Sequence, residues 1–115
     1  MEENLENILS YKNTMRNFNL NRKVMQDKVM NELHVYQNGG TFVVTQELIG
    51  FLNYLVQSDK MNVNILDKNN LPINIADVNE FLELVSERYF SSLNFYYQEY
   101  EQLRSSTKIE IALDL

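Results

Sequence analysis

Residues 77–107 read DVNEFLELVSERYFSSLNFYYQEYEQLRSST, a stretch without glycine or proline that carries most of the aromatic side chains. At about 100° per residue, its apolar and tyrosine side chains recur at alternating spacings of three and four and form one stripe. The stripe contains Val78, Leu82, Val85, Tyr89, Leu93, Tyr96, Tyr100 and Leu103. Asp77 is placed to cap the first turn, with Glu80 completing a capping box. The pattern predicts one long amphipathic helix over residues 77–107.

A second helical pattern covers residues 5–36, where the apolar side chains stay within an arc of about 100°. They are Ile8, Tyr11, Met15, Phe18, Met25, Val29, Leu33 and Tyr36. This pattern predicts a helix over about residues 3–37, ended by Gly39 and Gly40. Asparagine is a poor helix former, so the segment Asn17–Asn21 is where a break would fall.

The chain between these helices has shorter patterns. Residues 41–45 are β-branched and aromatic and predict a short strand, and Thr45 can cap the next element. Residues 46–58 are apolar on most of a helical circumference, which predicts a helix buried at the centre of the fold. Residues 61–75 alternate apolar and asparagine positions around a polar turn, which predicts a β-hairpin with Pro72 early in its second strand.

The last eight residues, 108–115, alternate aliphatic and polar positions and predict a C-terminal strand. The expected fold class is therefore α+β, with residues 1–115 as a single domain. Two long helices, at about 3–37 and 77–107, are expected to pack antiparallel to each other and around a small antiparallel sheet and the short buried helix.

Composition excludes several classes of protein. The chain has no cysteine, which rules out disulfides and cysteine-based zinc sites and fits a cytoplasmic protein. No apolar run approaches the ~20 residues of a membrane helix, so no membrane partner is expected. The net charge is −6, and acidic residues outnumber basic ones eight to three in residues 76–115. A nucleic-acid partner is therefore unexpected, because its phosphates require a contiguous basic surface.

Sixteen asparagines, with abundant isoleucine, tyrosine and lysine, are typical of AT-rich coding sequences, which include those of many bacteriophages. The expected location is thus the cytoplasm of a cell or phage host, or a virion if the gene belongs to a phage.

No group of residues predicts catalysis or cofactor binding. The only histidine, His34, falls on the polar face of the predicted first helix, without the orienting partner that a general base needs. The glycine pair Gly39–Gly40 precedes a strand, whereas a phosphate loop precedes a helix. We therefore expect a protein that is not an enzyme, with no catalytic, cofactor-binding or metal-binding residues.

Two features predict protein binding. On the wheel of the long helix, Phe90, Phe95 and Tyr97 point away from the apolar stripe, either because the fold buries rings on several sides or because they form an interface. The C-terminal tail is expected to pair either with the protein's own sheet or with a partner strand. The partner-binding candidates in the tail are Ile109, Ile111, Leu113 and Leu115.

These patterns favour a non-enzymatic structural or assembly protein that self-associates through its long helices and binds a protein partner through the aromatic residues. The alternative is a small regulatory adaptor of the transcription or replication machinery that docks through its C-terminal tail.

Overall fold

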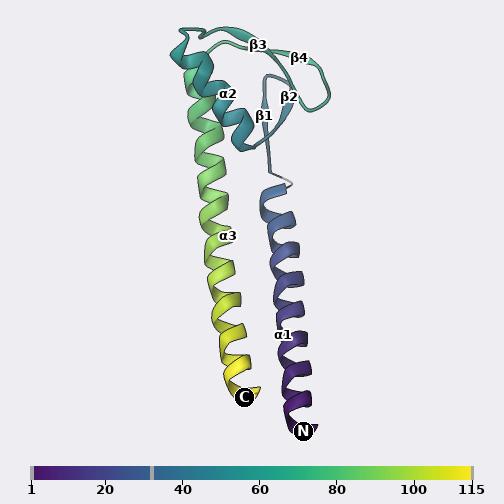
Figure 1. Cartoon of the computed structure of the whole chain (residues 1–115). Coiled ribbons are helices and arrows are strands. Elements are labelled where there is room, and N and C mark those ends of the chain that lie inside the picture. The colour runs from purple at the N-terminus through teal and green to yellow at the C-terminus, as the bar shows by residue number, and fades with distance from the viewer. Residues whose placement is uncertain (1, 32, 115) are drawn as a thin grey trace. The chain divides into compact units, whose positions relative to one another are not determined.

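The computed structural model describes residues 2–31 and 33–114 of the chain and confirms the α+β class (Figure 1). The elements in order are α1 (Glu2–Gln26), the π-helical turn η1 (Asp27–Asn31), β1 (His34–Gln37), β2 (Gly40–Val43), α2 (Gln46–Gln57), β3 (Val63–Leu66), β4 (Pro72–Ile75) and α3 (Val78–Asp114). Helix α1 runs without a break through Asn17–Asn21, so this polar segment does not interrupt it.

The chain forms two compact units that share α3. The helical unit contains the described residues 2–31 and 94–114, and the mixed unit contains the described residues 33–93. The twelve buried hydrophobic residues that the structure describes all belong to the mixed unit: Leu33, Val35, Phe42, Val44, Leu52, Leu55, Ile65, Ile73, Ile75, Val78, Phe81 and Val85. The expectation of a single domain over residues 1–115 stays a prediction.

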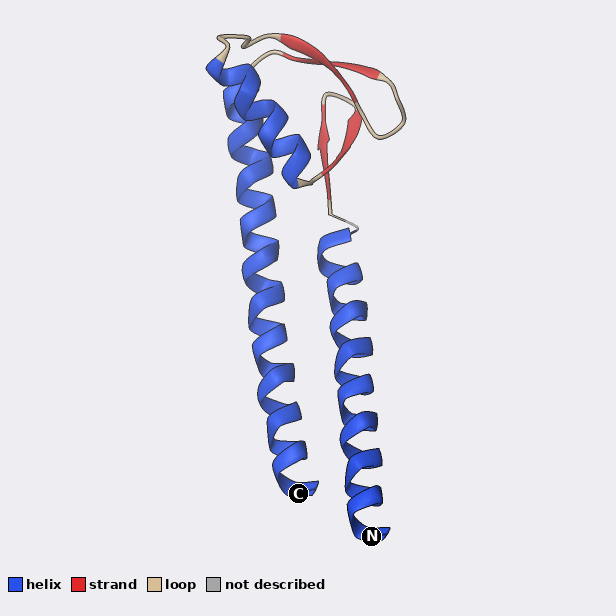
Figure 2. Cartoon of the chain, in the orientation of Figure 1, coloured by secondary structure: helices blue, strands red, loops and turns tan. Residues whose placement is uncertain are grey.

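The predicted first helix is too long at its C-terminal end. Helical structure ends at Asn31, and β1 instead pairs antiparallel with β2, so that Val35 lies opposite Phe42 (Figure 2). The connecting residues Asn38 and Gly39 both have positive φ angles, of 49° and 83°. Asn-Gly is the preferred pair for such a tight hairpin turn. The glycines therefore serve a hairpin and do not end a helix, and the helical phase of Leu33 and Tyr36 is coincidental.

The predicted second hairpin is confirmed, with β3 antiparallel to β4 and Pro72 as the first residue of β4. Asp67, at the turn, is buried and joins the two hairpins. Its carboxylate accepts hydrogen bonds from the amides of Thr41 at 3.0 Å, Asn69 at 2.8 Å and Leu71 at 2.9 Å. These amides, led by those of Leu71 and Thr41, hold the pKa of Asp67 below its usual value, although burial opposes them.

Helix α2 begins as predicted, because the Thr45 hydroxyl accepts a hydrogen bond from the Leu48 amide at 3.1 Å. Leu52 and Leu55 are buried in the core. The same core contains Phe42 and Phe81, whose ring centroids are 5.1 Å apart. The prediction that α2 is enclosed on most sides is wrong. Its outer face is exposed at Phe51 and Tyr54.

Helix α3 starts after Asp77, whose side chain accepts a hydrogen bond from the Glu80 amide at 3.1 Å, as the capping prediction requires. The predicted C-terminal strand is wrong, because α3 continues to Asp114. Thr107 and Ile111 extend the apolar stripe by two more turns, and Thr107 is buried. Lysine, glutamate, alanine and leucine, which make up much of residues 108–115, are also strong helix formers. The three poor helix formers Ser105–Thr107 are too few to end a helix of this length.

Candidate interaction surfaces

In the helical unit, α1 and the second half of α3 run antiparallel (Figure 1). The rings of Phe18 and Tyr100 meet at a centroid distance of 6.0 Å, and Tyr96 stacks on Tyr100 at 6.5 Å. An open hollow of about 280 Å³ lies beside this contact. Its lining residues are Met15, Phe18, Tyr100, Arg104, Thr107, Lys108 and Ile111. The predicted apolar stripes therefore face each other here without closing into a sealed core.

None of the described hydrophobic residues of the helical unit is buried. Nine large ones are exposed to about half of their surface or more: Leu5, Ile8, Leu9, Tyr11, Leu20, Val24, Phe95, Tyr97 and Ile109. Both units contain large apolar side chains, but among the described residues only the mixed unit buries them completely. The described part of the helical unit thus has an apolar surface and no fully buried apolar core.

The three predicted partner-binding rings are all exposed. Phe90 is 55% exposed, Phe95 52% and Tyr97 60%. Phe90 makes an edge contact with Tyr89, whose centroid is 5.4 Å away, and Tyr89 accepts a hydrogen bond from the Gln46 side chain at 2.8 Å. The interpretation that the fold buries these rings on several sides is thus not supported by their exposure.

The tail candidates do not share one face, because a helix spreads the alternating positions around its circumference. Ile109 is exposed, whereas Ile111 is half-buried and lines the hollow beside Phe18. The backbone of Leu113 belongs to α3, its side chain lies outside the described part of the structure, and Leu115 lies outside the described residues. Strand pairing of the tail, with its own sheet or with a partner, is therefore wrong for the described residues.

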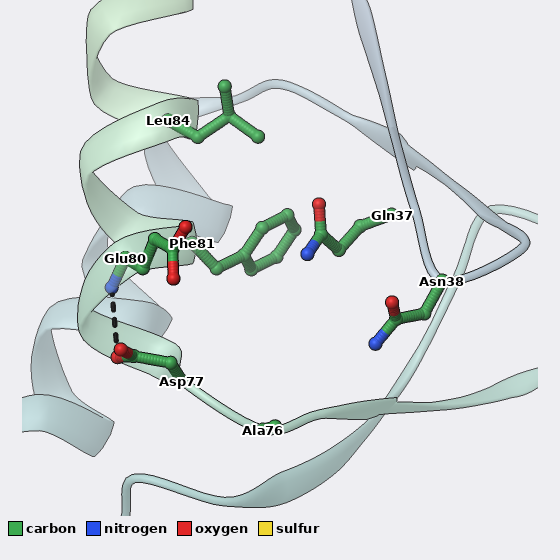
Figure 3. A pocket seen from close by; sticks show the side chains of 7 residues that line it. All are labelled: Gln37, Asn38, Ala76, Asp77, Glu80, Phe81 and Leu84. Atoms are coloured by element: carbon green, nitrogen blue, oxygen red, sulfur yellow. Dashed lines mark hydrogen bonds between the residues drawn. The ribbon is translucent and has the colours of Figure 1, made fainter.

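The mixed unit contains a second hollow, of about 260 Å³, between the β1–β2 turn and the start of α3 (Figure 3). Its lining residues are Gln37, Asn38, Ala76, Asp77, Glu80, Phe81 and Leu84. The Asp77 carboxylate is engaged as the helix cap, and the Asn38 amide donates to the Asn74 carbonyl at 2.7 Å. The remaining polar groups, Gln37 and Glu80, suit hydrogen bonding to a polar surface more than they suit a reaction.

His34 lies in β1, half-buried, and not on a helix as predicted. Its Nε2 atom is 3.4 Å from Nζ of Lys68, so the imidazole accepts at this atom when the ammonium donates. Residues 2–31 and 33–114 contain no group of three or more acidic or histidine side chains that could hold a metal ion. Within the same residues, no helix is long and apolar enough to cross a membrane.

Sequence reasoning missed one exposed surface, the outer face of α2. Phe51 is 48% exposed and Tyr54 is 62% exposed, beside Gly50, which is also exposed. On a helical wheel Phe51 lies only about 40° from Leu55, so the nearly continuous apolar run does not mark where the exposed side begins. The chain matches no family model, no curated protein and no solved structure, so these surfaces are interpreted from their own chemistry.

Proposed function

We propose that this protein is a non-enzymatic assembly protein that associates with further copies of itself through its helical unit. The observation that carries the proposal is the absence of buried hydrophobic residues among the described residues of this unit, beside nine exposed large ones. Isolated helices gain most of their stability from packing an apolar face. A second copy supplies that packing, because it brings the same two helices.

Two exposed rings of α3, those of Phe95 and Tyr97, belong to this surface. Phe90, the third exposed ring predicted to bind a partner, belongs to the mixed unit. Large rings contribute much contact area at little entropic cost, and exposed apolar groups of this size are typical of protein interfaces. The helices would thereby form a coiled-coil or bundle contact between copies, and the same rings could receive a different protein as partner.

The regulatory-adaptor alternative depended on an extended tail. Because residues 108–114 are helical, the feature that favoured this alternative is absent. An assembly protein of this composition suits the cytoplasm of a cell, or a phage host and its virions, where many copies of a small acidic protein would be present together.

The test replaces the exposed rings. In Phe95→Ser and Tyr97→Ser variants, we expect the self-association constant to fall about tenfold or more, because interface rings are frequent energetic hot spots. Tyr36→Ser is the matched control, since Tyr36 is 76% exposed but lies in β1. Light scattering across a concentration series measures the association, and circular dichroism checks the fold. Equal association of the three variants and the wild type would refute a role for these rings.

A further inference from the structure

The outer face of α2 carries a second, separate group of exposed residues. Glu47, Gly50, Phe51 and Tyr54 follow the spacing i, i+3, i+4 and i+7, which places them on one side of the helix, and all four are exposed. The core side of α2 carries Leu52 and Leu55, which are 0% and 6% exposed. Two exposed rings therefore project from an element whose inner side is fixed in the core.

Gly50 is at the centre of this face and is not explained by the protein's own packing. A Cβ atom built on Gly50 meets no atom within 4 Å, and its backbone does not occupy the left-handed region. Glycine in a helix interior destabilises the helix by about 0.5–1 kcal/mol relative to alanine. A glycine with open space above it is useful when another backbone approaches closely at that point.

We propose that this face packs antiparallel against the same face of a second copy, about a two-fold axis between Gly50 and Phe51. In that arrangement residues whose numbers sum to 101 lie at the same level along the two helices, so Tyr54 lies level with Glu47 of the second copy. Gly50 adjoins Gly50 of the other copy and allows close approach of the helices. The two Phe51 rings adjoin each other on the other side of the axis.

A second copy is favoured over a different partner because the face is complementary to itself. The face carries the hydrogen-bond acceptor Glu47 near one end and the donor Tyr54 near the other. The antiparallel arrangement pairs these two groups twice, and a two-fold interface requires this reciprocity. The surface belongs to the mixed unit, so it does not depend on self-association of the helical unit. If both surfaces are used, copies join in series into assemblies larger than a dimer.

The absence of cysteine permits a direct test by disulfide trapping. A Gly50→Cys variant places the two thiols at the helix crossing, within the Cβ separation that a disulfide requires. Asn53→Cys is the matched control, because Asn53 is also exposed on α2 but lies away from this face. Under mild oxidation we expect the Gly50→Cys dimer to form about tenfold faster than the Asn53→Cys dimer. Equal rates would overturn the proposal.

Two further variants separate this interface from the helical one. Trapping through Gly50→Cys is expected to persist when Tyr97→Ser is added, whereas loss of trapping would show that α2 contacts depend on the helical unit. Gly50→Glu, which adds bulk and two like charges at the axis, is expected to weaken association about tenfold compared with Asn53→Glu. Unchanged association in Gly50→Glu, with native circular dichroism, would also overturn the α2 contact. It would leave the proposal for the helical unit untouched.

Discussion

At the scale of single residues, Gly40 is buried and Gly50 is exposed. Adding a methyl group at these two positions is therefore expected to have opposite effects on stability. A Cβ atom on Gly40 would lie 2.5 Å from Cγ1 of Ile73 and 3.2 Å from Cε2 of Phe42, both in the core. Ile73 is β-branched and cannot easily rotate away. Gly40 therefore keeps the β1–β2 hairpin close to β4, whereas Gly50 has no such neighbour.

We predict that Gly40→Ala lowers the free energy of unfolding by about 1–3 kcal/mol, as overpacking of a core does. Gly50→Ala is its control and is predicted to raise that energy by about 0.5–1 kcal/mol through helix propensity. Urea denaturation at low protein concentration, where association is minor, measures both. Equal effects would mean that the contact between Gly40 and Ile73 is misplaced.

Asp67 makes the stability of the mixed unit depend on pH. Its pKa is lower in the folded protein than in the unfolded chain, because backbone amides stabilise the carboxylate. The folded state therefore gains stability from Asp67 above the unfolded pKa, about 3.9, and loses this gain as the pH falls through the folded pKa.

For Asp67→Asn we predict a lower urea midpoint than that of the wild type at neutral pH, and a difference that shrinks as the pH falls below about 4. Glu87→Gln, on the exposed side of α3, serves as the control and should show little difference at either pH. A difference for Asp67→Asn that is constant with pH would exclude the carboxylate as its source.

At the scale of elements, α2 divides into a buried and an exposed side between adjacent residues. Leu52→Ala is predicted to cost about 2–5 kcal/mol of unfolding free energy, because Leu52 is fully buried. Phe51→Ala removes a larger side chain but is predicted to cost under about 1 kcal/mol in the monomer, because Phe51 faces solvent. Chemical denaturation of both variants decides which side of α2 forms the core.

The C-terminal part of α3 gives a second prediction at this scale. Carbon chemical shifts of residues 108–112 are predicted to be helical in the isolated protein, continuous with those of residues 94–107. Slow amide exchange is expected around Thr107, which is buried, and faster exchange toward the end of the helix, where helices fray. Extended or unstructured shifts over residues 108–112 would contradict the helical tail.

Element type could be predicted where one period dominated the pattern. The start of α3, the cap at Thr45 and the β3–β4 hairpin follow from capping residues and alternation that admit one interpretation. The errors fall where two periods fit. Leu33 and Tyr36 fit a helical stripe, yet Asn38–Gly39 favours a hairpin, and long-range pairing with β2 decides between them. The alternating tail fits a strand, but Thr107 and Ile111 also continue the stripe.

The interaction surfaces could be predicted only in part. The exposure of Phe90, Phe95 and Tyr97 follows from their position away from the stripe. The exposed side of α2 could not be predicted from the sequence, because an apolar run does not indicate which side of the helix another element covers. The same holds for Asp67, whose hydrogen bond to the Thr41 amide joins residues distant in sequence.

At the scale of the whole molecule, the buried hydrophobic residues are distributed unevenly between the two units. The mixed unit encloses twelve buried hydrophobic residues, and the described part of the helical unit encloses none. A helical pair that cannot bury its own apolar side chains is stabilised when another chain covers them. The thermal midpoint of helix unfolding should consequently rise with protein concentration, whereas a monomeric helical unit would unfold at one temperature regardless of concentration.

The molar mass of the intact wild-type chain in solution shows whether the protein self-associates through its helical unit. Light scattering coupled to size-exclusion chromatography measures this mass over a concentration series up to ~100 µM, a range suited to micromolar association. We expect a dimer or larger assembly at the upper end of this range and a smaller mass for Tyr97→Ser at the same concentration. A wild-type protein that remains a 13.6 kDa monomer throughout would contradict this expectation.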